Sequence, residues 1–113
     1  NKKTEIPIPL LDKINKYFGS FSEFKQEFIS MAKELKGSGY TFLVLDKNNK
    51  LRIINMSNQD TPYYYGFIPI MTIDVWEHSY YLKYTYNREE YLNNIFNIID
   101  FTKVYQIYLN SIK

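Results

Sequence analysis

Two residues near the middle of the chain have the types and the spacing that could hold a metal ion. Asp74 and His78 stand four positions apart, and His78 is the only histidine in the sequence. The apolar run 68–73 predicts a strand that ends at Asp74. A carboxylate and an imidazole so placed can point at one position, and this ligand pair suits iron or manganese. The same residues also fit a helix start, in which Asp74 caps the first turn and His78 is a hydrogen-bonded polar group.

The residues before this strand predict two helices and a hairpin. Apolar residues at helical spacing in 10–18 predict a helix that ends at Gly19. Ser20 and Glu23 have the spacing of a capping box, which predicts a second helix with an apolar face reaching Leu35. A polar cluster at 46–50 separates the apolar runs 40–45 and 51–56, a pattern typical of an antiparallel hairpin. Residues 57–67 predict a loop by their composition.

Two more helices are expected after His78, the first capped by Asn87 and the second running from Thr102 to about Ile112. The apolar side of the first is expected to include Tyr91, Leu92, Ile95, Phe96, Ile98 and Ile99. The second is expected to turn Val104, Tyr105, Tyr108 and Leu109 inward. These four helices and three strands, together with the possible helix start at Asp74, predict an α+β fold with a three-stranded antiparallel sheet packed with about five helices.

Composition restricts the class of protein. A chain of 113 residues with 45% hydrophobic residues predicts one folded domain. The absence of cysteine excludes disulfides and thiolate metal sites, and is compatible with the cytoplasm, where we expect the protein. A net charge of +2 is too small to predict nucleic-acid binding, which would rest on the 19% aromatic content alone. No signal peptide or membrane-spanning run is apparent, so no membrane partner is expected.

Residues 74–81, Asp-Val-Trp-Glu-His-Ser-Tyr-Tyr, resemble the D-V-W-E-H-A-Y-Y signature of the iron/manganese superoxide dismutases. The resemblance implies that Asp74 and His78 are two of the four protein ligands of one manganese or iron ion in each complete subunit. It implies that Glu77 reaches across a homodimer interface to the partner's ligand histidine. It also implies that Tyr81 points to the opening through which superoxide, the substrate, reaches the neighbouring subunit. Glu77, His78 and Tyr81 would therefore form the homodimer contact.

Two other stretches extend the resemblance. Residues 18–21 resemble F-G-S-F, and residues 37–40 resemble G-S-G-W with Tyr40 in place of the tryptophan. The resemblance implies that Tyr40, Phe42 and Trp76 wall the metal cavity. The change from tryptophan to tyrosine adds a hydroxyl group near the expected site, which would alter the cavity shape and the redox tuning.

Residues 58–60, Asn-Gln-Asp, resemble the N-Q-D of manganese-type members of the family. The resemblance implies a catalytic role for Gln59, which would hydrogen-bond the solvent molecule on the metal and favour manganese. An ordinary turn explains the same triplet.

The resemblance covers residues 10–108 and only the C-terminal α/β domain of the family. In the family, an N-terminal helical hairpin supplies the other two ligand histidines, and we expect that domain to be absent from residues 1–113. The resemblance therefore implies superoxide dismutation by the complete protein. The chain alone, with one histidine, should hold the metal weakly or not at all and be inactive. The alternative is a catalytically inactive dimerisation or binding module derived from the family.

Overall fold

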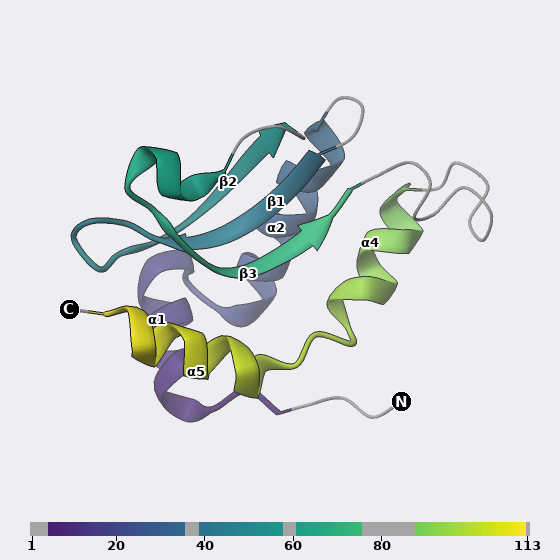
Figure 1. The fold of residues 1–113 in the computed structure, drawn as a ribbon. Coiled ribbons are helices and arrows are strands. Elements are labelled where there is room, and N and C mark those ends of the chain that lie inside the picture. Colours follow the sequence, from purple (N-terminus) through teal and green to yellow (C-terminus); the bar gives the residue numbers. More distant parts are fainter. Residues whose placement is uncertain (1–4, 36–38, 58–60, 76–87, 113) are drawn as a thin grey trace.

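Three strands form one antiparallel sheet in the order β2–β1–β3 (Figure 1). The computed structural model describes residues 5–35, 39–57, 61–75 and 88–112. Along the chain the elements are α1 (Ile8–Phe18), α2 (Phe21–Glu34), β1 (Gly39–Leu45), β2 (Leu51–Ser57), the 3-10 helix η1 (Pro62–Tyr65), β3 (Ile68–Asp74), α4 (Arg88–Phe96) and α5 (Phe101–Ser111). The predicted α+β class and three-stranded antiparallel sheet are confirmed.

The hairpin of β1 and β2 is held by its polar turn. The Asp46 carboxylate accepts hydrogen bonds from the backbone N–H groups of Asn48 at 2.8 Å and Lys50 at 3.0 Å. Asn49 has a φ of 63°, a left-handed conformation that asparagine tolerates better than most residues. The turn is therefore encoded locally, as the sequence predicts.

The third strand, β3, pairs with the free side of β1, so that β1 is central. The register runs from Tyr40 opposite Asp74 to Leu45 opposite Ile68. Proline has no backbone N–H to donate to a sheet. Pro69 is tolerated because β3 is an edge strand, which has a neighbouring strand on one side only. Asp74 therefore lies at the end of the sheet where β1 begins and β3 ends; we call this end the Asp74 edge.

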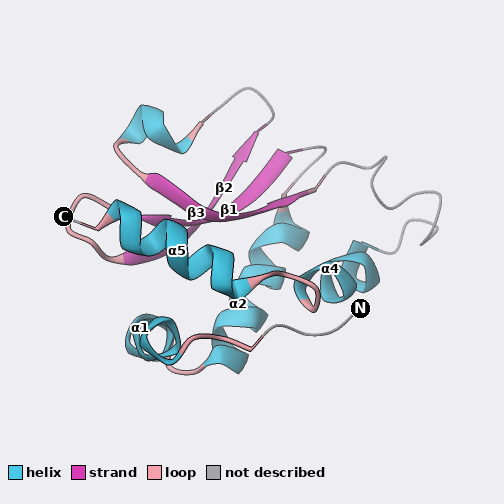
Figure 2. Cartoon of the chain, turned by 60° about the horizontal axis from the view of Figure 1, so that its bottom comes forward, coloured by secondary structure: helices cyan, strands magenta, loops and turns pink. Residues whose placement is uncertain are grey.

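The two faces of the sheet differ. Figure 2 shows α1, α2 and α4 on one side of the sheet and η1 on the other. Thr41 is fully buried toward α2; its hydroxyl donates to Asn55 Oδ1 at 2.6 Å, and the Asn55 amide donates to the Met31 carbonyl at 2.7 Å. Because side chains alternate along a strand, Tyr40 and Phe42 lie on the opposite face.

An aromatic cluster joins three helices under the sheet. Phe96 of α4 lies with its ring 5.6–6.0 Å from four other rings. Those rings belong to Phe21, Phe24, Phe28 and Phe101. Aromatic pairs at such separations contribute beyond the area they bury. The cluster therefore fixes α4 and α5 against α2.

The capping residues set the starts of two helices. Ser20 Oγ accepts a hydrogen bond from the Glu23 N–H at 3.0 Å, which confirms the predicted start of α2. Asp100 caps α5 by accepting from the N–H groups of Thr102 and Lys103 at 3.1 and 3.3 Å. The longest described helix, α2, has 14 residues. Among the helices in the described ranges, none has the length and apolar composition needed to cross a membrane.

Two residues predicted to face inward do not. Helix α4 ends at Phe96, before the helical spacing can carry Ile98 to its apolar side, and Ile98 is 59% exposed. Leu109 is 47% exposed because α5 turns its buried side through Phe101, Val104 and Tyr108. Both predictions followed the local apolar pattern and were wrong about the side that packs.

The predicted loop at 57–67 was also wrong in part, because η1 lies within it. Pro62 occupies the first turn of η1, where its fixed φ is suitable and its missing N–H is not needed. Gly66 ends the helix with a φ of 81°, and its N–H donates to the Tyr63 carbonyl at 3.1 Å. The proline and glycine therefore define a short helix rather than irregular chain.

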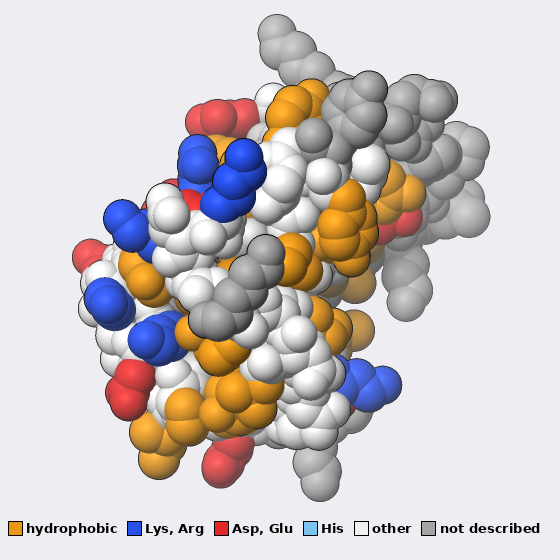
Figure 3. All heavy atoms as spheres, turned by 60° about the vertical axis from the view of Figure 1, so that its left-hand side comes forward, with side chains coloured by type: hydrophobic (Ala, Val, Ile, Leu, Met, Phe, Trp, Pro, Cys, Tyr) orange, Lys and Arg blue, Asp and Glu red, His pale blue; other side chains and the backbone are white. Residues whose placement is uncertain are grey.

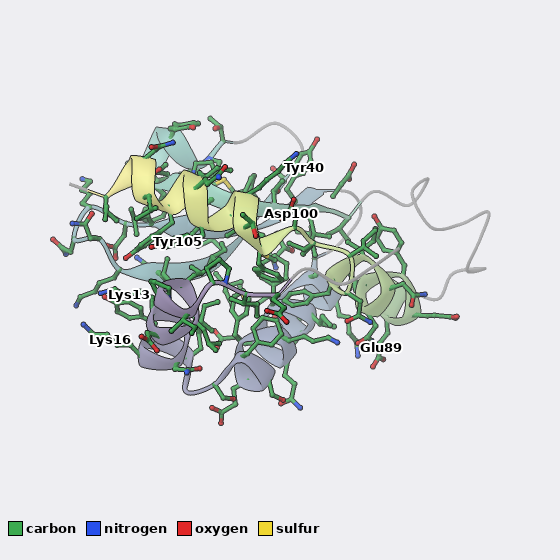
Figure 4. All side chains as sticks on the ribbon, turned by 90° about the horizontal axis from the view of Figure 1, so that it is seen from below. Lys13, Lys16, Tyr40, Glu89, Asp100 and Tyr105 are labelled. Carbon is green, nitrogen blue, oxygen red and sulfur yellow. The ribbon has the colours of Figure 1, made fainter. Side chains whose placement is uncertain are left out.

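Three tyrosines gather between α1 and α5. Tyr108 is buried, and its ring stacks on Tyr105 at 6.4 Å between centroids. Figure 4 shows Tyr105 at the same end of the molecule as Lys13 and Lys16 of α1. Burial raises the pKa of Tyr108 above its ordinary value of 10.0, and the charges of Tyr17 and Tyr105 raise it further. The folded protein therefore favours the protonated phenol.

This shift predicts a loss of stability in alkali. The contribution of Tyr108 is fully present below pH 10 and is lost as the pH rises above 10, because the unfolded chain then releases a proton that the folded chain retains. Tyr108→Phe should make the free energy of unfolding less sensitive to pH in this window, measured by urea denaturation at about pH 9 and about pH 11. Tyr63→Phe, at a position that is 66% exposed, is the control. Equal alkaline losses in both variants would contradict the assignment.

Candidate metal centre

Asp74 is the only predicted metal ligand that falls within the described residues. It is the last residue of β3, and it is exposed. Its partner across the ladder is Tyr40 of β1. Because residues directly opposite in an antiparallel pair point to the same face, Asp74 and Tyr40 share the face that is turned away from α2.

Tyr40 and Phe42 form an aromatic wall beside this carboxylate. Their rings lie 5.9 Å apart between centroids and are tilted by 35°. Both residues are half-buried, and Phe42 pairs with Thr72, two residues before Asp74 on β3. Figure 4 shows Tyr40 at the sheet. The structure thus brings Asp74, Tyr40 and Phe42 onto one face, while their roles as ligand and cavity wall stay predictions.

The other predicted site residues lie outside the described residues. They are Gln59, Trp76, Glu77, His78 and Tyr81. The described strands nevertheless show where the neighbouring chain segments leave the sheet. Ser57, two positions before Gln59, pairs with Gly39, and Asp74 pairs with the next residue, Tyr40. Strands β2 and β3 therefore end at the same edge of the sheet (Figure 1).

The peptide unit that follows Asp74 is fixed by two hydrogen bonds. The Tyr91 hydroxyl of α4 donates to the Asp74 carbonyl at 3.0 Å. The N–H of Val75 donates to the Gly39 carbonyl at 2.8 Å. Tyr91 is 7% exposed and Val75 is fully buried, so the strand end is enclosed although the Asp74 residue itself is exposed.

The described residues contain only part of the expected set of metal donors. In ranges 5–35, 39–57, 61–75 and 88–112, no group of three or more His, Cys, Asp or Glu side chains could hold a metal ion. An exposed carboxylate at a rigid strand end fits one oxygen ligand of manganese or iron. Asp74 therefore fits part of a metal site, which needs further ligands from elsewhere.

The exposed lysines of the hairpin turn lie at the opposite end of the sheet from this edge. Lys47 and Lys50 stand in the turn after β1, and Asp74 pairs with the start of β1. Figure 3 shows the side of the molecule that carries this turn, where Lys and Arg side chains lie among hydrophobic and acidic ones. A strand of seven residues spans about 20 Å, more than twice the Debye length of about 8 Å in physiological salt. These cations therefore contribute little to the field at Asp74.

Sequence reasoning missed the contact between Tyr91 and Asp74. Tyr91 was expected only as part of an apolar helix side. The available signal was its hydroxyl, because a tyrosine on a buried helix face needs a hydrogen-bond partner. The sequence does not identify that partner, which comes from a different element.

Comparison with known proteins identifies the family of the chain. Residues 7–107 match the family described as iron/manganese superoxide dismutases, C-terminal domain. The chain is 44% identical over 99 residues to superoxide dismutase (Mn/Fe) 2 of Staphylococcus aureus strain bovine RF122 / ET3-1, covering 88% of this chain and 49% of that protein. The corresponding protein of strain Mu50 / ATCC 700699 is 43% identical over 99 residues, which again cover 88% of this chain and 49% of that protein. The chain thus spans about half the length of these curated relatives. It belongs to the iron/manganese superoxide dismutase family, in which it corresponds to the C-terminal domain.

Proposed function

We propose that this chain is the C-terminal domain of a superoxide dismutase that uses manganese or iron. The reaction converts two superoxide anions and two protons into dioxygen and hydrogen peroxide. The observation that carries the proposal is the position of Asp74, which begins the Asp-Val-Trp-Glu-His motif at the end of β3, opposite Tyr40. That edge is also where β2 ends, two residues before Gln59.

Asp74 and His78 would hold the metal, which supplies the one-electron exchange with superoxide when it is bound. Asp74 would be ionised and His78 neutral, because these are the forms that bind a metal. The negative charge of Asp74 would favour the more oxidised state of the ion. The Gln59 amide would hydrogen-bond the solvent of the site and so tune its acidity. Tyr40, Phe42 and Trp76 would exclude bulk water from the cavity.

The remaining ligands would come from a preceding domain. One histidine and one aspartate leave half of a four-ligand protein site unfilled, and the chain covers about half of its relatives. We refer to this chain joined to such a domain as the complete protein. In a homodimer of the complete protein, Glu77 would orient the partner's ligand histidine, and Tyr81 would reach the neighbouring site. A cytoplasmic location remains part of the proposal.

Metal analysis of two proteins tests the proposal. We expect the 113-residue chain to purify with well under one manganese or iron ion per chain, because Asp74 and His78 leave most of the coordination sphere to water. The complete protein should hold about one ion per subunit and consume superoxide. Elemental analysis by mass spectrometry and a superoxide-consumption assay provide the measurements.

Each result has a distinct meaning. One tightly held ion per 113-residue chain would contradict the division of ligands between two domains. A complete protein that folds and dimerises but holds no metal would contradict the enzymatic function and favour the alternative dimerisation or binding module.

A further inference from the structure

Tyr91 connects helix α4 to the end of strand β3. Its hydroxyl donates to the carbonyl of Asp74 at 3.0 Å, and its side chain is 7% exposed. The contact joins residues 17 positions apart in the chain, on either side of the segment that contains His78. It is therefore a tertiary contact and not a feature of either element alone.

The peptide unit between Asp74 and Val75 is held from two opposite sides. Its carbonyl accepts from Tyr91, and its N–H donates to the Gly39 carbonyl at 2.8 Å. On the other side of the Asp74 Cα, the β3 backbone is fixed by pairing with Tyr40. Both peptide planes that flank the Cα are thus restrained. Together they set the direction of the Cα–Cβ bond, which leaves the Asp74 carboxylate only its side-chain rotations.

Helix α4 gives the hydroxyl a fixed starting point. Leu92, the next residue, is fully buried, and Phe96 packs among the rings of α2. At the start of the helix, the Lys33 ammonium of α2 pairs with the Glu89 carboxylate at 3.0 Å. Figure 4 shows Glu89 at this side of the molecule. Because Leu92 and Phe96 are packed in the core on the same helix, and the Lys33–Glu89 pair is exposed and adds little, it is core packing that places the Tyr91 hydroxyl against β3.

We propose that Tyr91 is a positioning residue for the metal site, which fixes the direction of the Asp74 carboxylate by holding the Asp74 carbonyl against α4. The inference rests on the proposed function, because it takes Asp74 as a ligand. A metal site needs its ligand distances within about 0.2 Å, so freedom at the strand end would weaken binding. Tyr91 does not touch the metal in this proposal and acts only through Asp74.

The competing interpretation is that the hydrogen bond only satisfies a buried hydroxyl. In that case the bond would contribute to stability but not to the geometry of Asp74. The two interpretations predict different results for two measurable quantities, the exchange rate of the Val75 N–H and the affinity for manganese. The Val75 N–H shares its peptide unit with the Asp74 carbonyl. If Tyr91 restrains this unit, removal of the Tyr91 hydroxyl should make the Val75 N–H exchange faster with solvent.

The test uses Tyr91→Phe in the complete protein, which keeps the ring and removes only the hydroxyl. Tyr108→Phe is the matched control, because Tyr108 is also buried, at 6% exposed, and lies on α5. In the metal-free protein we expect Val75 amide exchange to be about five- to tenfold faster in Tyr91→Phe, the factor for one lost hydrogen bond. We expect manganese affinity to fall about tenfold or more, because the loss of a residue that supports a metal ligand typically costs about 10- to 100-fold in affinity. A p-aminophenylalanine at position 91, which restores a donor, should recover both values.

The outcomes separate this inference from the proposed function. Faster Val75 exchange with weaker manganese binding, both absent in Tyr108→Phe, supports the positioning role. Manganese affinity unchanged in Tyr91→Phe, while the unsubstituted protein binds one ion, overturns the inference and leaves the proposed function intact. An unsubstituted complete protein that binds no manganese overturns the proposed function, whatever happens to exchange at Val75.

Discussion

The variants Asp74→Asn and His78→Ala should each remove superoxide dismutase activity from the complete protein. We expect activity to fall by more than about a hundredfold. Substitution of residues that only support the ligands typically costs about 10- to 100-fold, and loss of a ligand itself should cost more. Asparagine keeps the size of Asp74 but removes the negative charge that binds and partly neutralises the ion. Alanine removes the nitrogen ligand of His78 altogether. Activity and metal content, measured on the same samples, provide the check.

The matched control for the charge change is Asp12→Asn. Asp12 is an exposed carboxylate on α1, away from the Asp74 edge of the sheet, and its loss should leave activity and metal content unchanged. Near-normal turnover in either Asp74→Asn or His78→Ala would contradict the ligand assignment. A metal-bound but inactive Asp74→Asn variant would instead support a role for its charge in the redox step.

The second large effect concerns the aromatic cluster. Phe96→Ala should destabilise the 113-residue chain by about 3–5 kcal/mol, because Phe96 is 2% exposed and the cavity left by its ring cannot close easily. The free energy of unfolding of native proteins is roughly 5–15 kcal/mol. A loss of this size would therefore leave a substantial fraction of the molecules unfolded at raised temperature. Urea denaturation followed by circular dichroism measures the change.

Ile98→Ala provides the comparison for this prediction. Ile98 lies two residues beyond Phe96 and is 59% exposed, so its truncation should change the free energy of unfolding by less than about 0.5 kcal/mol. Similar losses in both variants would show that Phe96 does not join α4 to α2 as described. The pair also tests the corrected end of α4, because a longer helix would bury Ile98.

Local sequence signals predicted most of the fold. The Asp46–Lys50 turn, the Ser20 cap and the apolar runs of the three strands are each visible in residues close together in the chain, and the structure has all three. The motif from Asp74 to Tyr81 likewise identified the family, because a long specific motif does not depend on knowing the packing. The position of Asp74 at the end of β3 was also predicted from the apolar run before it.

The tertiary structure alone decided which sides of the helices pack and which elements support the site. Apolar spacing could not place Ile98 or Leu109, because their exposure depends on where α4 ends and how α5 approaches the sheet. The hydrogen bond from Tyr91 to Asp74 could not be predicted either, because nothing in the sequence of α4 or of β3 shows that the two elements lie in contact. The sequence by itself determined the family and the candidate ligand at the strand end. Folding determined how that strand end is held, because only packing brings a helix hydroxyl to its carbonyl.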